Sequence, residues 1–261
     1  MASDAPTLTY VGHATVLLRL DGVGVLVDPL LVGRLGPVRR IAPPVRLGEL
    51  EDVALILLTH AHLDHFSVSS LRRLSRRAEL VLPAGTGRLV RNLGFAAVHE
   101  IVAGEEMSFA GLRVRGQPAL HRGRRHPAAS LTPSLGYEVR GAVSVYHAGD
   151  TGEVPEPAAF AGRPDVVCLP VSGYGARLPE DHMSPRTAGV AVATLDPRLA
   201  VPIHWGTYQL QGMTRRMRER DLWRPHAFAS AVEALGNGTR VRVLQPGESL
   251  ALTPDVLGAA T

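Results

Sequence analysis

Short apolar segments, separated by Gly, Pro and polar turn positions, recur along the whole chain. Three of them lie between residues 7 and 28, and the Asp21-Gly22 pair between the last two predicts a β-hairpin. Residues 53–58 form a continuous apolar run, which predicts a strand buried on both faces. In the second half, strands are predicted over residues 97–117, 135–140, 143–147, 165–171, 199–203 and 240–244.

Helical spacing of apolar positions predicts helices between these strands. The predicted helices cover residues 67–77, 86–93, 185–195 and 225–235. Residues 30–50, which are rich in Pro, Gly and Arg, are predicted to form a long surface loop.

Each half of the chain thus combines strands with helices. We therefore expect an α/β fold in which two sheets pack face to face with helices outside, a four-layer αββα sandwich. No linker or low-complexity segment interrupts residues 1–261, so a single domain is predicted.

Composition restricts the class of protein. A hydrophobic content of 45% with 20% charged residues is ordinary for a soluble globular protein. The net charge of +4 modestly favours anionic ligands and does not establish a nucleic-acid surface. No signal sequence and no apolar run of ~20 residues is present, so a cytoplasmic protein without a membrane span is predicted. The oligomeric state stays open, a homo-oligomer included.

The segment His60-Ala61-His62-Leu63-Asp64-His65 directly follows the apolar run of residues 53–58. Imidazole and carboxylate groups are typical ligands of zinc, manganese and iron. On an extended segment His60 and His62 point to the same side, whereas Asp64 and His65 follow as the chain turns. Two ligands for one metal and two for another are therefore predicted.

Three further metal ligands are expected at the ends of other predicted strands. His121, Asp150 and His204 each follow a separate strand. Side chains at neighbouring strand ends converge on one edge of a sheet scaffold.

These motifs resemble the metallo-β-lactamase fold, whose signature is His-x-His-x-Asp-His followed by distant His, Asp and His ligands. The chain is most similar to the branch of N-acyl-phosphatidylethanolamine phospholipase D and ascorbate-6-phosphate lactonase. The segments that carry the resemblance to this branch are Val11-Gly12-His13-Ala14-Thr15, Leu26-Val27-Asp28-Pro29, Ala148-Gly149-Asp150-Thr151-Gly152, His182-Met183-Ser184-Pro185 and His204-Trp205-Gly206-Thr207-Tyr208.

The resemblance implies a dinuclear metal-dependent hydrolase. His60, His62 and His121 would hold one metal, and Asp64, His65 and His204 the other. Asp150 would bridge them. A metal-bound hydroxide would then cleave a phosphodiester or a related ester of a small, anionic molecule. Zinc is favoured by the ligand types, with manganese and iron as alternatives. A structural zinc needs four ligands and seven are present, which favours a catalytic site.

Groups that act beside the metals are less strongly indicated. Asp64 is predicted to be catalytic in its role as a metal ligand. His182 is the best candidate for a group that donates a proton or a hydrogen bond to the oxyanion, and the alternative is a cap-loop histidine. Asp28 either orients a ligand imidazole or is a turn aspartate. His13 either supports the metals or substrate or is a loop histidine.

Substrate contacts are also proposed for loop residues. Arg122, together with Arg124 and Arg125, either binds a phosphate or carboxylate or belongs to a solvated loop. Tyr174 and Trp205 either line the pocket or belong to the core.

Three other functions are alternatives to the phosphodiesterase. A lactonase or another carboxylic-ester hydrolase would use the same metals. A non-catalytic metal-dependent binding protein would retain the fold without turnover. A nuclease is disfavoured, because nucleases of this fold usually carry a large inserted domain and no nucleic-acid partner is expected.

Overall fold

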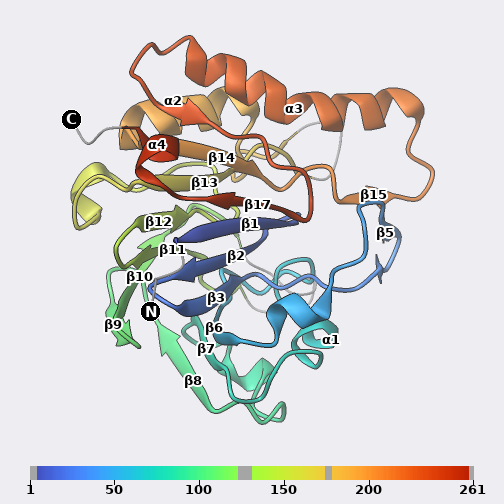
Figure 1. Cartoon of the computed structure of the whole chain (residues 1–261). Coiled ribbons are helices and arrows are strands. Elements are labelled where there is room, and N and C mark those ends of the chain that lie inside the picture. Colours follow the sequence, from blue (N-terminus) through green and yellow to red (C-terminus); the bar gives the residue numbers. More distant parts are fainter. Residues whose placement is uncertain (1–4, 123–130, 174–177, 259–261) are drawn as a thin grey trace.

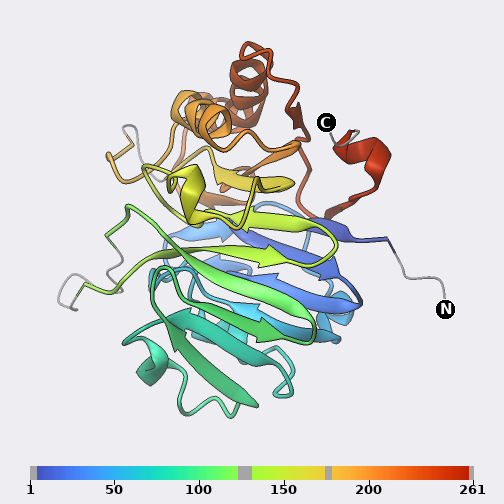
Figure 2. The same ribbon diagram turned by 90° about the vertical axis from the view of Figure 1, so that its left-hand side faces the viewer.

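The computed structural model describes residues 5–122, 131–173 and 178–258, and within them two seven-stranded sheets pack face to face (Figure 1). Two helices, α2 (Pro185–Leu195) and α3 (Arg215–Glu233), lie side by side against the second sheet, on the side away from the first (Figure 2). The predicted α/β sandwich of the metallo-β-lactamase type is confirmed.

The first sheet is formed by strands from the N-terminal half and one strand from near the C-terminus. In spatial order they are β17 (Glu248–Ala251), β1 (Thr7–Gly12), β2 (Thr15–Leu20), β3 (Val23–Val27), β6 (Val53–Leu57), β7 (Glu79–Pro83) and β8 (Ala97–Ile101).

The second sheet is formed by strands that follow β8. In spatial order they are β16 (Arg240–Val241), β14 (Leu199–Ile203), β13 (Val166–Pro170), β12 (Ser144–His147), β11 (Leu135–Arg140), β10 (Leu112–Pro118) and β9 (Glu106–Phe109).

The direction of the strands determines at which edge of the sandwich the loops after them meet. In the first sheet β1, β3 and β6 run the same way, and in the second sheet β10, β12, β13 and β14 do. The two sets of carboxyl ends meet, since Leu135 N donates a hydrogen bond to Thr59 O at 2.9 Å and His204 N donates one to His13 O at 2.7 Å. Loops that follow these strands therefore share one edge of the sandwich.

The main core lies between the two sheets. Its side chains come from alternate positions of both, such as Leu18 and Leu55 in the first sheet and Val139 and Val167 in the second, all without exposed surface. The Asp21-Gly22 hairpin turn joins β2 to β3 as predicted, with both residues at positive φ.

The outer face of the first sheet differs from expectation. Helices are predicted over residues 67–77 and 86–93, but the structure has only α1 (Val68–Leu71) and the 3₁₀ turn η2 (Gly87–Leu89) there. In this segment Gly87 N–H donates to the Glu100 carboxylate of β8, which leaves no space for a Cβ at position 87. Loops with apolar side chains, such as Phe66 and Leu74, cover this face instead.

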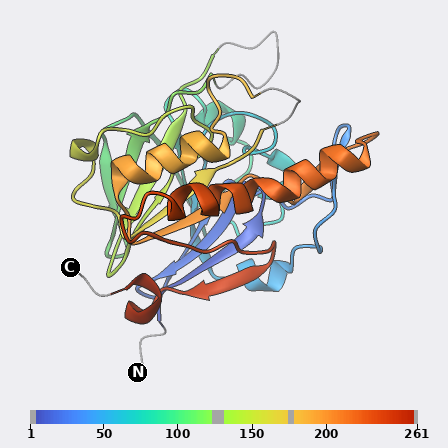
Figure 3. The same cartoon turned by 90° about the horizontal axis from the view of Figure 1, so that it is seen from above.

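Other boundaries also differ from the prediction. The last long helix begins at Arg215 rather than near Pro225, because Thr214 caps it by accepting a hydrogen bond from Met217 N. Its N-terminal half extends past the sheet toward the segment of β4 (Arg34–Leu35) and β5 (Val38–Arg40) (Figure 3). No described helix is long and apolar enough to span a membrane.

The loop predicted over residues 30–50 is partly ordered into a small third sheet. That sheet consists of β15 (Tyr208–Leu210), β5 (Val38–Arg40) and β4 (Arg34–Leu35). The remaining short helices are η1 (Leu47–Leu50), η3 (Pro157–Ala159) and α4 (Pro254–Leu257).

Candidate metal centre

The predicted metal ligands converge at the shared edge of the two sheets. His60, His62, His121 and Asp150 each offer one ligand atom within 4.8 Å of the others. The Nε2 atoms of His60 and His121 both lie 3.0 Å from Nδ1 of His62. The structure therefore brings together residues that are up to 90 positions apart in the chain.

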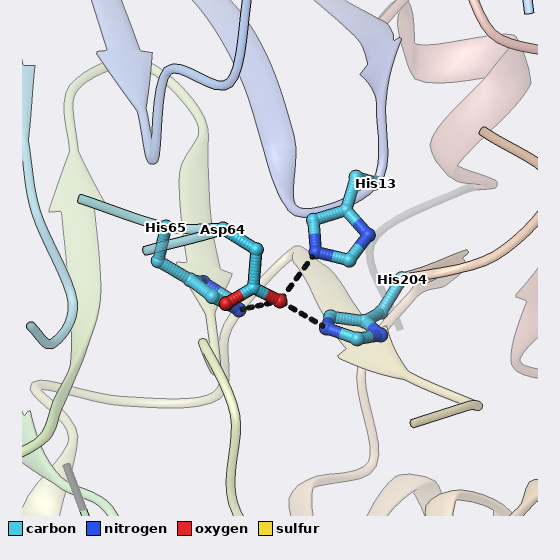
Figure 4. A group of neighbouring side chains, drawn as sticks. All are labelled: His13, Asp64, His65 and His204. Carbon is cyan, nitrogen blue, oxygen red and sulfur yellow. Dashed lines mark hydrogen bonds and ion pairs between the residues drawn. The ribbon is translucent and has the colours of Figure 1, made fainter. Parts of the chain in front are cut away.

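A second group adjoins the first and contains His13, Asp64, His65 and His204 (Figure 4). Asp64 Oδ2 lies 3.0 Å from His13 Nε2 and 3.9 Å from Nε2 of both His65 and His204. His13 was predicted only as a residue that supports the metals or substrate, or as a loop histidine. The structure places its ring nitrogen inside the ligand group itself.

Asp150 lies between the two groups. Its Oδ2 is 3.3 Å from His65 Nε2, and its Oδ1 is 3.4 Å from His204 Nε2, while it also belongs to the group of His60. Among the described residues, His65 Nε2 and Asp150 Oδ1 are buried atoms that make no hydrogen bond. Buried polar atoms rarely stay without such partners, so their donor set fits cations at this position.

Hydrogen bonds behind the ligands fix which ring nitrogen faces the centre. His65 Nδ1 donates to Asp28 Oδ2 at 2.7 Å, and Thr59 Oγ1 donates to the same oxygen at 2.6 Å. Since that hydroxyl proton is committed, Thr59 Oγ1 accepts from His60 Nδ1 at 3.0 Å. His121 Nδ1 donates to Asp181 O at 3.1 Å. These bonds direct Nε2 of all three imidazoles toward the centre, as metal ligation requires.

The charge states also suit a metal. Burial lowers the pKa of His60 and His204 well below the ordinary value, because it disfavours the charged imidazole. Burial raises the pKa of Asp150, but His204 and His65 outweigh it and hold that pKa well below its usual range. Neutral imidazoles and an ionised carboxylate are the forms that bind divalent ions.

His65 is the exception among these ligands. Burial lowers its pKa, yet the carboxylates of Asp150, Asp28 and Asp64 raise it well above the ordinary value. One proton must therefore leave His65 before its Nε2 can bind a metal.

Three residues of the centre have a left-handed backbone, which side chains other than Gly rarely adopt. They are His13 at φ 60°, Asp28 at φ 44° and His204 at φ 66°. Each follows directly after a strand, where the unusual conformation turns the side chain inward. Such outliers concentrate at functional sites, because the surrounding structure must hold them in place.

A family model described as the β-lactamase superfamily domain matches residues 24–205, more than half of the chain. The chain belongs to the β-lactamase superfamily. It is 34% identical over 251 residues to a UPF0173 metal-dependent hydrolase of Methanopyrus kandleri. This match covers 93% of this chain and 98% of that relative.

Two further comparisons agree with this assignment. This chain is 28% identical over 243 residues to N-acyl-phosphatidylethanolamine-hydrolyzing phospholipase D 1 of Caenorhabditis elegans. The match covers 82% of this chain and 67% of that relative. The solved structure of Igni18, a metallo hydrolase of Ignicoccus hospitalis, matches with a TM-score of 0.71 and 25% identity over 94% of this chain and 97% of that one. This β-lactamase superfamily protein is a metal-dependent hydrolase.

Asp28 of this hydrolase makes the contacts expected of a group that orients a ligand. It is fully buried, and it accepts from Thr59 N as well as from Thr59 Oγ1 and His65 Nδ1. The replacement Asp28→Asn is expected to weaken metal binding about 10–100-fold, because an amide has one acceptor oxygen and cannot hold all three donors. Competition with a chromogenic chelator measures this affinity.

Asp165 provides a matched control for that variant. Its carboxylate likewise accepts from a backbone N–H and a hydroxyl, at 2.9 and 2.8 Å, both on Ser144. Asp165→Asn is expected to leave metal affinity within about twofold. Equal losses of metal affinity in the two variants would mean that the Asp28 effect is only a general loss of structure.

His182 and Asp181 form a polar pair beside the first ligand group. His182 Nε2 lies 3.3 Å from Asp150 Oδ2, and its Nδ1 lies 3.2 Å from Asp181 Oδ1. Asp181 Oδ2 lies 3.3 Å from His121 Nδ1, so this carboxylate contacts both histidines. Asp181 is not among the residues predicted from the sequence. Its position next to His182 is visible in the chain, but its contact with His121, sixty positions away, is not.

The remaining predicted substrate contacts fall outside this group. The side chain of Arg122 is exposed, and only its backbone N–H reaches the centre, as a 3.3 Å hydrogen bond to Asp181 Oδ2. Arg124, Arg125 and Tyr174 lie outside the described residues. Trp205 is buried and also lines a cavity beside the centre, so it is both a core residue and a pocket residue.

Proposed function

We propose that this protein is a dinuclear metal-dependent hydrolase that cleaves a phosphodiester or a related ester. The observation that carries the proposal is the pair of adjoining ligand groups with Asp150 between them. We assign three ligands to each ion and one to both: His60, His62 and His121; Asp64, His65 and His204; and the shared Asp150. Zinc suits these ligands, and manganese and iron bind similar sets.

The ligand charges favour an anionic substrate. When bound, the two divalent ions would lower the pKa of water toward neutrality and polarise the bond under attack. Asp64 and Asp150 are the two carboxylates among the seven assigned ligands, and Asp28 adds one buried negative charge behind His65. With Asp181 beside His121, four carboxylates surround the centre, but only Asp64 and Asp150 would bind the two divalent ions directly, so each ion would still favour an anionic oxygen of a phosphodiester.

His182 is our candidate for the proton donor. Its side chain keeps 17% of its surface exposed beside Asp150. Burial lowers its pKa, but the carboxylates of Asp150 and Asp181 raise it above the ordinary value. The Asp181 contribution persists when Asp150 binds metal. A protonated His182 would supply the proton that a leaving alkoxide or phenoxide needs.

A phosphodiester is preferred to a carboxylic ester on two grounds. The relative in Caenorhabditis elegans is named for phospholipase D activity, which breaks a phosphodiester bond. Divalent ions would also favour a substrate that is anionic before attack, which a lactone is not. We further propose a small-molecule substrate, with a homo-oligomer as an open arrangement.

Metal removal and reconstitution test the proposal. Chelator-treated protein should lose turnover of bis(p-nitrophenyl) phosphate by about 10³-fold or more, because the ions contribute several kcal/mol to the transition state. Reconstitution with zinc, manganese or ferrous iron, one at a time, should restore turnover as metal content approaches two ions per chain. Elemental analysis and p-nitrophenol release measure the two quantities.

Each alternative function gives a different result in the same experiment. Hydrolysis of a lactone without release of p-nitrophenol would replace the phosphodiesterase by a lactonase. Two bound ions without turnover of either substrate would favour the metal-dependent binding protein. A stoichiometry of one ion or fewer after reconstitution would contradict the dinuclear assignment.

A further inference from the structure

A cavity of about 310 Å³ adjoins the candidate metal centre. Its volume lies at the lower end of the range for small-molecule pockets. His13 and His204 line it, so it is continuous with the second ligand group. Its other walls come from β5, from the chain after β14 and from the N-terminal half of α3. A group bound at the metals can therefore extend directly into this space.

The cavity is predominantly apolar. Its apolar lining includes Pro37, Val38, Trp205, Tyr208, Met213 and Met217. Two charged side chains of opposite sign, Asp221 and Arg224, also reach it, so the described lining carries no net formal charge beyond its histidines. Asp221 already accepts hydrogen bonds from Ser172 Oγ at 3.1 Å and from Gly206 N at 3.2 Å. The lining thus favours an uncharged, apolar group.

One wall of the cavity is rigid. Trp205 stacks on Tyr10 with ring centroids 5.9 Å apart, and its Nε1 donates to Pro202 O at 2.9 Å. Tyr208 donates its hydroxyl proton toward backbone carbonyls of the 30–32 segment, and the Arg40 guanidinium lies 5.7 Å from its ring centroid. Two fixed aromatic faces next to His204 give the inner part of the cavity a defined shape.

The opposite wall is adaptable. Met213 and Met217 are half-buried at the start of α3, and Leu210 is 42% exposed at the same side. Methionine side chains adjust to ligands of different shape, because they are unbranched and polarizable. The cavity therefore combines a fixed inner wall with an outer wall that can accommodate related apolar groups.

We propose that this cavity binds the apolar arm, a short alkyl or aryl group, of an ester whose anionic group is held at the metal centre. The proposal rests on the proposed function, because it names the substrate class for the same site. It follows from the continuity with His204, the neutral apolar lining and the limited volume of the cavity.

A homologous substrate series tests the arm. Methyl, ethyl, propyl and butyl p-nitrophenyl phosphates share one leaving group and differ only in the alkyl arm. The kcat/KM of the metal-loaded enzyme should rise about fourfold per fully buried methylene, and by at least about tenfold from methyl to butyl. Met217→Trp, which fills the cavity, should reduce the butyl-to-methyl ratio to about twofold or less.

Met107 supplies the matched control for that variant. It is also half-buried, but it lies on β9 at the far edge of the second sheet. Met107→Trp should keep the butyl-to-methyl ratio of the wild type. The same decrease in both variants, or a flat wild-type series, would overturn the cavity proposal.

A binding measurement separates this proposal from the proposed function. Trp205 and Trp223 are the two tryptophans of the chain, and Trp223 is 63% exposed. In the metal-loaded Trp223→Phe protein, Trp205 is then the sole fluorescent tryptophan. We expect 4-bromobutylphosphonate, which cannot be hydrolysed at its C–P bond, to quench it by contact, and butylphosphonate to reverse the quenching more effectively than methylphosphonate.

The outcomes of the kinetic and the fluorescence experiments show which of the two proposals is wrong. Quenching with this chain-length order but no turnover of any diester would overturn the proposed function and retain the cavity as a ligand site. Turnover without chain-length dependence and without Trp205 quenching would overturn the cavity proposal and retain the hydrolase.

Discussion

Asp150→Asn is expected to produce the largest loss among single replacements in this protein. The carboxylate lies within 3.4 Å of His65, His182 and His204, so its removal affects both proposed ions. We expect metal content to fall from two ions per chain to at most one. We also expect kcat for bis(p-nitrophenyl) phosphate to fall about 10³-fold or more, since both attack and bond polarisation depend on the pair of ions. Elemental analysis and steady-state kinetics measure the two effects.

The exposed Asp255 on α4 gives a control for that variant. Asp255→Asn changes the same functional group outside the centre and should retain both ions and full activity. Thermal unfolding of the metal-free proteins separates a folding defect from ligand loss, because Asp150 also neutralises His65 in the buried centre. A variant Asp150→Asn that binds two ions with wild-type kcat would refute the shared-ligand assignment.

His182→Gln is expected to have the second-largest effect, and one that depends on the leaving group. Without a proton donor, kcat/KM for diphenyl phosphate should fall about 10²–10⁴-fold, because phenoxide is a poor leaving group. For bis(p-nitrophenyl) phosphate the loss should be less than about tenfold, since p-nitrophenoxide departs readily without protonation. Metal content should stay at the wild-type value. Parallel kinetics with the two diesters check this difference.

The exposed His226 on α3 serves as the control for His182. His226→Gln should change neither diester rate by more than about twofold. If His182→Gln lowers both rates equally, His182 stabilises the developing oxyanion rather than donating a proton. If it lowers neither rate, His182 is a loop histidine without a catalytic role.

The fold was largely predictable because strands and turns have local signals. Residues 53–58 are continuously apolar, and the strand found there, Val53–Leu57, is buried as predicted. Ser184-Pro185 predicted the start of α2, and the structure shows the capping box with Thr187. The helix predicted over residues 86–93 was wrong: only the 3₁₀ turn Gly87–Leu89 forms, and Gly87 N–H donates to the Glu100 carboxylate of a neighbouring strand. A contact of that kind is not visible in local periodicity.

The candidate ligands could be found for a similar reason. His60, His62, Asp64 and His65 lie in one short motif, and each of the three distant candidates follows a strand signal. The weaker predictions concerned residues whose partners come from elsewhere. The hydrogen bond from His65 to Asp28 favours a residue that orients an imidazole over a turn aspartate, and it joins residues 37 positions apart.

By itself, the sequence determined the sandwich, the strand ends and the chemical types of the candidate metal ligands, because hydrophobic alternation and short motifs act over a few residues. Only the tertiary structure decided that His13 joins the second ligand group, that Asp181 contacts both His121 and His182, and that an apolar cavity adjoins His204. These features depend on how two sheets meet and where α3 lies over them. Distance in space, rather than order along the chain, sets each of these contacts.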